Sequence, residues 1–227
     1  MTNQQTNQPG NRPVPLDKCE CASRLSRPGR LVHQAILRVF AHTGQAPSRT
    51  DLDQVADAAG VEPAAALAEL ERADLIVLDP HGELLAAYPF SAAPTPHRLT
   101  LGSGVSVHAM CAIDALGVSA MLGQPITVTS AELDTGRPVT VRLDGDQATW
   151  QPPTAVVLAA ATGDCCAPSA QRTCGYINFF PTDAAALAWA GDHPELSWAL
   201  LDQPRALATA IAEFGPLLRD PEATPPR

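Results

Sequence analysis

The stretch Val105-Ser-Val-His-Ala-Met-Cys-Ala-Ile-Asp-Ala-Leu-Gly-Val-Ser-Ala-Met-Leu-Gly123 changes its periodicity within a few residues. Its first part alternates apolar and polar side chains, as a β-strand does, and from Cys111 onward apolar side chains recur at helical spacing. Gly123 and the proline two residues later end that helix. A strand that leads directly into an apolar helix predicts a domain in which helices pack on a sheet.

Cys111 and Asp114 lie three residues apart at the start of this expected helix, so they share one face. The unpaired N–H groups and the positive end of the helix dipole favour a thiolate there, which predicts a lowered pKa for Cys111. A thiol beside a carboxyl is suited to nucleophilic and proton-transfer chemistry. The spacing alone leaves a second interpretation open, in which the cysteine is only buried and the aspartate only pairs with the helix dipole.

Short strand-like runs separated by glycine-bearing turns occupy most of the second half of the chain. We expect strands at residues 98–101, 105–109, 126–130, 139–143, 148–150 and 155–160, with later helices near 182–191 and 203–214. Sequential hairpins favour a mainly antiparallel sheet with packed helices, so the fold class is α+β.

The first half predicts three helices, at residues 31–43, 50–59 with Thr50 as cap, and 62–72, followed by two strand-like runs around the turn Asp79-Pro-His-Gly82. Three helices and a hairpin outline an N-terminal winged-helix-like helical domain. We therefore divide the chain into a flexible polar leader (1–30), a winged-helix-like domain (31–93) and a catalytic domain (94–227).

Charge argues against nucleic acid as a partner. The chain has a net charge of −9, and the helix that would enter the major groove carries Glu62, Glu69 and Glu71. No apolar run approaches the ~20 residues needed to span a membrane, and the N-terminal stretch lacks the apolar core of a signal peptide. We therefore expect a cytoplasmic protein with neither a membrane nor a nucleic-acid partner.

The six cysteines are expected to be reduced thiols, because no export sequence accompanies them. Their spacing gives no paired Cys-x-x-Cys motif, so a structural zinc site is not predicted. Two interpretations of Cys19 and Cys21 stay open: an incidental pair in a flexible tail, or a capture site for a thiophilic metal.

Five blocks of the chain together resemble the organomercurial (alkylmercury) lyase family and occur in the family's order. These blocks are Pro94-Thr-Pro-His-Arg98, Cys111-Ala-Ile-Asp-Ala-Leu116, Met121-Leu-Gly123, Thr135-Gly-Arg-Pro-Val139 and Cys174-Gly-Tyr-Ile-Asn-Phe-Phe180. The N-terminal region also resembles the family's helical, winged-helix-like lead domain, so the resemblance covers most of the chain.

The resemblance implies a lyase that cleaves the carbon–mercury bond of R–Hg⁺ to R–H and Hg²⁺, as in mercury resistance and detoxification. Cys111, Asp114 and Cys174 match the family's catalytic cysteine, aspartate and second cysteine, and they are expected to contact the mercury. Mercury(II) is a soft cation that prefers thiolate sulfur, and a neighbouring carboxylic acid can protonate the leaving carbon. Desolvation and nearby thiolates are expected to raise the pKa of that carboxyl.

Two positions depart from the family's pattern: Gly175 and Glu132 stand where many members have cysteines. We expect the irregular segment 162–173 to be a mobile loop over the site, in which Cys165 and Cys166 either relay Hg²⁺ outward as accessory ligands or lie there by chance. His97 and Tyr176 are expected to be structural.

No organic cofactor is implied, since mercury is the substrate and product, and external thiols are expected to be needed for product release. Expected partners are organomercurial small molecules and a mercuric reductase or small thiols that receive Hg²⁺. Two other functions remain alternatives: a non-catalytic thiol-based protein that binds mercury or other thiophilic metals, and a metal-responsive regulator, which the acidic third helix disfavours.

Overall fold

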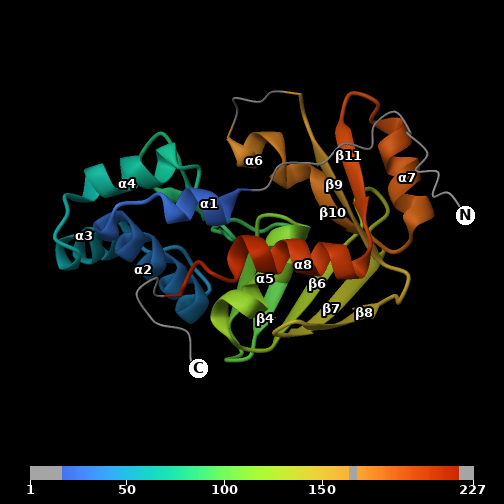
Figure 1. Cartoon of the computed structure of the whole chain (residues 1–227), viewed down its shortest axis with the longest axis horizontal. Coiled ribbons are helices and arrows are strands. Elements are labelled where there is room, and N and C mark those ends of the chain that lie inside the picture. Colours follow the sequence, from blue (N-terminus) through green and yellow to red (C-terminus); the bar gives the residue numbers. More distant parts are fainter. Residues whose placement is uncertain (1–16, 164–167, 220–227) are drawn as a thin grey trace, which may run out of the picture.

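Helix α5 (Ala112–Leu122) lies at the centre of the protein, which is described by a computed structural model over residues 17–163 and 168–219 (Figure 1). Its residues from Ala112 to Ser119 are all buried, and a helix that is apolar on every side must be covered on every side. Strands β5, β6, β7 and β10 and helix α8 (Gln203–Phe214) supply that cover.

The larger sheet has eight antiparallel strands in the order β1-β2-β3-β5-β4-β6-β7-β8. Its inward face is apolar because the side chains alternate: along β7, Val139, Val141 and Leu143 are buried and their neighbours are not. The strands are β1 (Ile76–Leu78), β2 (Leu84–Ala87), β3 (Phe90–Ser91), β4 (Arg98–Leu101), β5 (Ser106–Ala109), β6 (Ile126–Ala131), β7 (Pro138–Asp144) and β8 (Gln147–Gln151).

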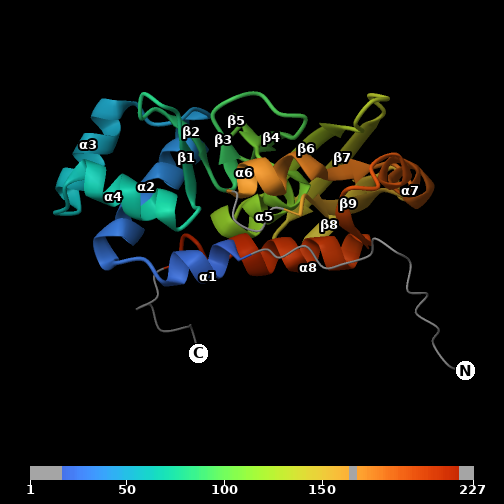
Figure 2. The ribbon, with the colours of Figure 1, turned by 90° about the horizontal axis from the view of Figure 1, so that it is seen from above.

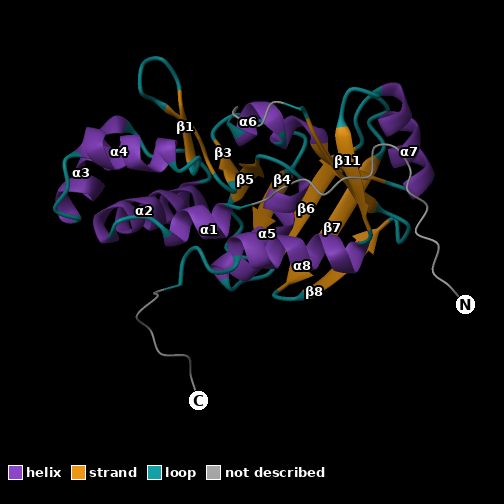
Figure 3. Ribbon diagram, turned by 45° about the horizontal axis from the view of Figure 1, so that its top comes forward, coloured by secondary structure: helices purple, strands orange, loops and turns teal. Residues whose placement is uncertain are grey.

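A second, three-stranded antiparallel sheet has the order β10-β9-β11. Its strands are β9 (Val156–Ala161), β10 (Ile177–Phe180) and β11 (Ser197–Leu201), and the helical elements around it are α6 (Ser169–Arg172), the 3₁₀ turn η1 (Cys174–Tyr176) and α7 (Asp183–Asp192). Pairing of β10 with β9 fixes the position of the chain that precedes β10. Figure 3 shows both sheets, with α7 beside β11 and α8 next to α5.

Four helices precede the large sheet: α1 (Lys18–Ser23), α2 (Arg27–Thr43), α3 (Arg49–Ala58) and α4 (Pro63–Arg72). Ser48, rather than the expected Thr50, caps α3, because its side chain accepts the Asp51 N–H while Asp51 accepts from the Ser48 N–H. The hairpin β1–β2 continues through β3 into the large sheet. This sheet therefore includes strands from both sides of residue 93, the expected boundary between the winged-helix-like and catalytic domains.

The expected flexible leader over residues 1–30 is helical where the structure describes it, since it holds α1 and the start of α2. Residues 1–16 lie outside the described residues. The Lys18 N–H donates to Glu213 of α8 at 2.8 Å, and α1 and α8 lie end to end (Figure 2). This prediction was wrong for residues 18–30 because α1 depends on tertiary contacts and not on an amphipathic pattern of its own.

The mainly antiparallel α+β architecture expected from the sequence is confirmed: each expected strand from 98–101 to 155–160 is present within about two residues, as are the two C-terminal helices. The agreement follows from alternating side chains in most strands, from a short continuous apolar run in β9, and from helix stops at glycine. Gly123, for example, ends α5 in the left-handed region, with φ +63°.

Gly117 generates a testable prediction, because α8 lies directly against it. A Cβ atom there would come within 2.7 Å of the Ala210 carbonyl oxygen and within 2.6 Å of the Phe214 ring. We expect Gly117→Ala to destabilise the protein by about 1–3 kcal/mol in urea unfolding. Gly191→Ala, in a helix with open space, is the control and should be neutral or stabilising by up to about 1 kcal/mol. Equal effects of the two variants would contradict close α5–α8 packing.

Candidate active site

Cys111 occupies the N-cap position of α5, directly after β5, and its backbone is extended, with φ −152° and ψ 179°. Its Sγ accepts a hydrogen bond from the Asp114 N–H at 3.4 Å, the contact that serine, threonine or aspartate usually makes there. The side chain is 2% exposed. The strand-to-helix switch therefore holds a thiol at a helix start, inside the protein and not at its surface.

Asp114 lies in the first turn of α5 and is 3% exposed, and its Oδ1 has no hydrogen-bond partner among the described residues. Burial raises the pKa of its carboxyl to about 7, against the opposing effects of the Cys111 hydrogen bond and the Lys18 charge. The expected rise in the pKa of this carboxyl is thus present, and desolvation is its main cause. Near neutral pH the group can hold a proton and release it.

Cys174 lies near Cys111 and Asp114 in the fold, although it comes from the segment that precedes β10. It begins η1 immediately before β10, it is 6% exposed, and the Gly175 carbonyl after it accepts from the Asn178 side chain at 3.1 Å. Phe179, further along β10, packs edge-on against Trp150. The Cys-x-x-x-x-Phe-Phe block is therefore a turn followed by a strand that anchors the turn in the core.

All three sequence-predicted residues line one buried cavity of about 20 Å³, which has room for about one water molecule. Its lining combines apolar and polar side chains. The remaining lining residues are Asp17, Lys18, Tyr88, Ile113, Ser169, Thr173, Ile177, Glu213 and Phe214. Tertiary folding thus brings the two thiols and the carboxyl to a common space that bulk water does not fill.

The expected lowering of the Cys111 pKa is wrong. Burial raises the pKa of this thiol well above its usual value, and hydrogen bonding with Cys174 and the Asp114 charge act in the same direction. The N-terminus of α5 still favours the thiolate, but the loss of hydration raises the pKa by more than the helix start lowers it. At rest Cys111 therefore carries a proton, which must leave when a soft metal binds its sulfur.

The sequence reasoning missed the other residues of this cavity, among them Lys18 and Tyr88. The Lys18 ammonium lies 3.9 Å from the centroid of the Tyr88 ring, and the Tyr88 hydroxyl has no hydrogen-bond partner among the described residues. Burial, followed by the charge of Cys174, raises the pKa of Tyr88. Composition held one clue, because Lys18 is the only lysine in the chain and the other 14 cationic side chains are arginines.

The remaining cysteines lie away from this cavity or outside the described residues. Cys19 and Cys21 sit on α1, half-buried, and burial is the main cause that raises the pKa of each thiol. Cys21 lines a separate hollow of about 450 Å³ between α1, α4 and α6. Cys165 and Cys166 fall in 164–167, outside the described residues. The segment expected to be a loop includes the short helix α6.

His97 and Glu132 have structural surroundings. His97 is buried with its Nδ1 2.9 Å from Ser130 Oγ, and burial lowers its pKa to about 4. Glu132 is 5% exposed and binds the Arg137 guanidinium through both carboxylate oxygens, at 2.6 and 2.8 Å. An ion pair therefore ties together the turn before β7.

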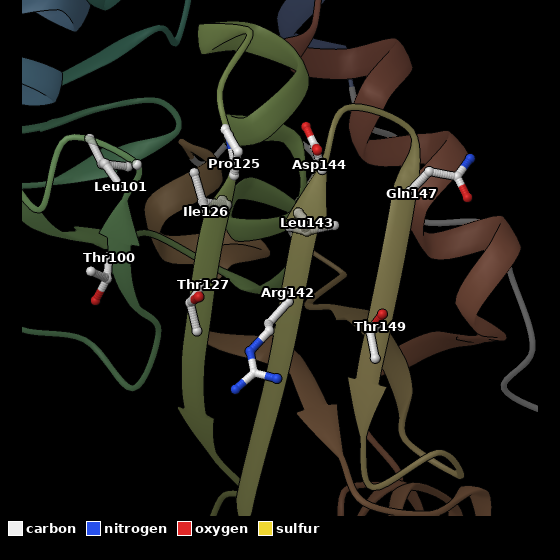
Figure 4. A pocket seen from close by; sticks show the side chains of 11 residues that line it. Thr100, Leu101, Pro125, Ile126, Thr127, Arg142, Leu143, Asp144, Gln147 and Thr149 are labelled. Carbon is white, nitrogen blue, oxygen red and sulfur yellow. The ribbon is translucent and has the colours of Figure 1, made fainter.

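A larger hollow of about 390 Å³ lies on the outer face of the large sheet, where Arg142 stands between Thr127 and Thr149 (Figure 4). No cysteine or histidine lines it. In the described part of the chain, no group of three or more His, Cys, Asp or Glu side chains is arranged to hold a metal ion. The candidate chemistry therefore belongs to the small cavity with the two thiols.

The Asp114 pKa predicts how stability depends on pH. A carboxyl in an unfolded chain titrates near 3.9, so the folded protein holds a proton that the unfolded chain has released. The stability contributed by this group is present below about pH 3.9 and is lost as pH rises through 7. Between pH 4 and pH 8 we expect the wild type to lose roughly 4 kcal/mol relative to Asp114→Asn in urea unfolding. A pH-independent difference would contradict a buried, protonated Asp114.

Comparisons with known proteins agree on one family. A family model described as alkylmercury lyase matches residues 90–215. An alkylmercury lyase of Streptomyces lividans is 38% identical over 103 residues, covering 44% of this chain and 46% of that protein, and one of Staphylococcus epidermidis is 30% identical over 122 residues, covering 54% and 56%. The chain thus spans about half the length of the relatives it matches.

The fold is also that of a solved structure. The crystal structure of the mercury-bound form of MerB2 superposes with a TM-score of 0.71 at 23% identity, over 89% of this chain and 97% of that one. The family match covers more than half of the chain and includes both cavity cysteines and the aspartate between them. This protein belongs to the alkylmercury lyase family.

Proposed function

We propose that this protein is an organomercurial lyase that cleaves the carbon–mercury bond of R–Hg⁺ by protonolysis. The observation that supports this function most directly is that Cys111, Cys174 and a carboxyl with a pKa of about 7 line one buried cavity. Two thiols suit a soft metal, and an acid that is protonated near neutral pH suits delivery of a proton.

Capture begins with replacement of the thiol protons. The first thiol that binds R–Hg⁺ gives up its proton, and the second does the same when it joins the mercury. One proton passes to the Asp114 carboxylate, if that group is ionised, and the other leaves the site. The adduct then has two thiolates and one carbon on mercury, and the sulfur electrons weaken the remaining carbon–mercury bond.

Cleavage transfers the proton of Asp114 to carbon. The electron pair of the carbon–mercury bond forms the new C–H bond, R–H departs, and mercury remains as neutral Hg(S-Cys)₂ beside the Asp114 carboxylate. The apolar side chains of Ile113, Ile177 and Phe214 line the cavity and suit the organic group. By excluding water they also keep the acid protonated until it reacts.

Release of the product requires an incoming thiolate, because mercury held by two sulfurs moves by exchange between sulfurs. We propose that small thiols or a mercuric reductase receive Hg²⁺, with Cys165 and Cys166 as accessory relay thiols, and that no organic cofactor takes part. The reaction as written needs only thiols and protons.

We also propose that the N-terminal helices and the β1–β2 hairpin form a winged-helix-like cover for the catalytic domain and not a DNA reader. Two glutamates at α4 accept hydrogen bonds from the protein's own backbone: Glu69 accepts from the Ser26 N–H, and Glu62, the N-cap of α4, accepts from the Ala65 N–H. Among the described residues, no helix combines the length and apolarity needed to cross a membrane. A cytoplasmic location is part of the same proposal.

The first prediction for this function concerns the thiols. We expect Cys111→Ser and Cys174→Ser each to abolish methane release from methylmercury in excess thiol, because a serine oxygen is a hard ligand. Serine is also a good N-cap, so Cys111→Ser should unfold no earlier than the wild type in a thermal melt. Methane release near the wild-type rate from either folded variant would refute the assignment.

The second prediction separates an enzyme from a protein that only sequesters mercury. Asp114→Ala should still bind R–Hg⁺ through two sulfurs but should release hydrocarbon ~100- to 10,000-fold more slowly, since the general acid is gone. Bound mercury measured by mass spectrometry and methane measured in the headspace test the two steps independently. If bound substrate reacts at the wild-type rate, Asp114 is not the proton donor.

A further inference from the structure

Lys18 is the one lysine among 227 residues, and it is buried, with 5% of its surface exposed. Burial of a cation costs free energy unless its partners compensate the charge. The burial of Lys18 therefore indicates a specific role for this side chain. Among the described residues that line the thiol cavity, it is the only cationic side chain, whereas Asp17 and Glu213 add carboxyl groups.

The ammonium is fixed by contacts from several elements. Lys18 Nζ donates to Asp74 Oδ2 at 2.6 Å, to the Asp74 carbonyl at 2.5 Å and to Ser169 Oγ at 3.0 Å, and it lies over the Tyr88 ring. The Lys18 backbone N–H is held by Glu213. The charge therefore has one defined place beside the cavity.

Exposure of the two partners is unequal. The Lys18 side chain is 6% exposed. The Asp74 side chain is 30% exposed and lines the hollow of about 450 Å³ between α1, α4 and α6. Water therefore screens the negative charge of Asp74 more than the positive charge of Lys18. The charge of Lys18 acts on the Asp114 carboxyl and lowers its pKa, in opposition to burial and to the charge of Glu213.

The proposed reaction places negative charge in that field. The adduct of R–Hg⁺ with two thiolates carries a charge of −1, and after proton transfer the same charge rests on the Asp114 carboxylate beside neutral Hg(S-Cys)₂. From capture of the second thiol to the end of the chemical step, the cavity therefore holds one net negative charge more than it holds when both thiols and the carboxyl are protonated.

We propose that Lys18 is the charge-compensating residue of this reaction, whose buried ammonium stabilises the anionic two-thiolate adduct and then the Asp114 carboxylate; this inference rests on the proposed lyase function. Lys18 acts through space and through its fixed position and does not bind mercury. It is therefore a positioning residue and not a proton donor.

A purely mechanical role is the competing explanation, because the Lys18–Asp74 ion pair also ties α1 to the turn after α4, and both side chains contact Ser169 at the start of α6. Two variants separate the explanations, since both break this ion pair. Lys18→Met removes the cation and keeps an apolar stem of similar length. Asp74→Asn removes the carboxylate, and asparagine tolerates the left-handed backbone found there, with φ +53°.

The experiment measures bound mercury and single-turnover methane release for the full-length wild type and both variants, with thermal melts as a check on folding. We expect Lys18→Met to bind methylmercury with unchanged stoichiometry and to release methane about tenfold or more slowly. Asp74→Asn leaves the cation in place without its screened partner and should react at or above the wild-type rate.

Equal slowing in the two variants would assign Lys18 to mechanical support and overturn the inference, as would a wild-type rate in Lys18→Met. If Lys18→Met does not fold, Lys18→Gln makes the same comparison, because its amide can still donate to Asp74 but carries no charge. Absence of methane from the wild type would instead refute the lyase function itself, so the two failures are distinguishable.

Discussion

Withdrawal of the first turn of α5 from water is the constraint on which the rest of the molecule depends. A helix with buried side chains on all sides needs a sheet beneath it and a second helix against it, and Gly117 lets α8 approach closely enough to complete that cover. The same packing carries Cys111 and Asp114 into the interior. Fold and candidate chemistry thus have a common origin in the burial of one helix.

Dehydration then sets the protonation states of both groups. Burial raises the pKa of the Cys111 thiol and of the Asp114 carboxyl, so that both groups favour their uncharged, protonated forms. Such a cavity favours an incoming soft cation that can displace protons, and it penalises any step that leaves a bare negative charge. A cation held at a fixed distance from the reacting groups lowers that penalty, and the position of Lys18 fits this requirement.

Much of the fold could be predicted from local pattern. Most strands between residues 98 and 151 alternate buried and exposed side chains, and α5 and α8 are apolar helices with capping residues at their starts. The cavity could be predicted only in part. Cys111 and Asp114 lie three residues apart in the sequence, but Cys174 was paired with them through family resemblance alone. Lys18 was missed because α1 is stabilised by contacts with Glu213 and Asp74, and such long-range partners leave no periodicity in a short polar segment.

A chain with a single, sequestered lysine also presents solvent with no freely reachable side-chain amine. Reagents that attack amines can modify this side chain only while α1 is detached from the cavity, so the rate of labelling measures the free energy of that local opening. Modification of Lys18 itself thereby reports access to the cavity without any engineered probe. Because Lys18 and both thiols line the same cavity, the same measurement follows how often Cys111 and Cys174 meet water.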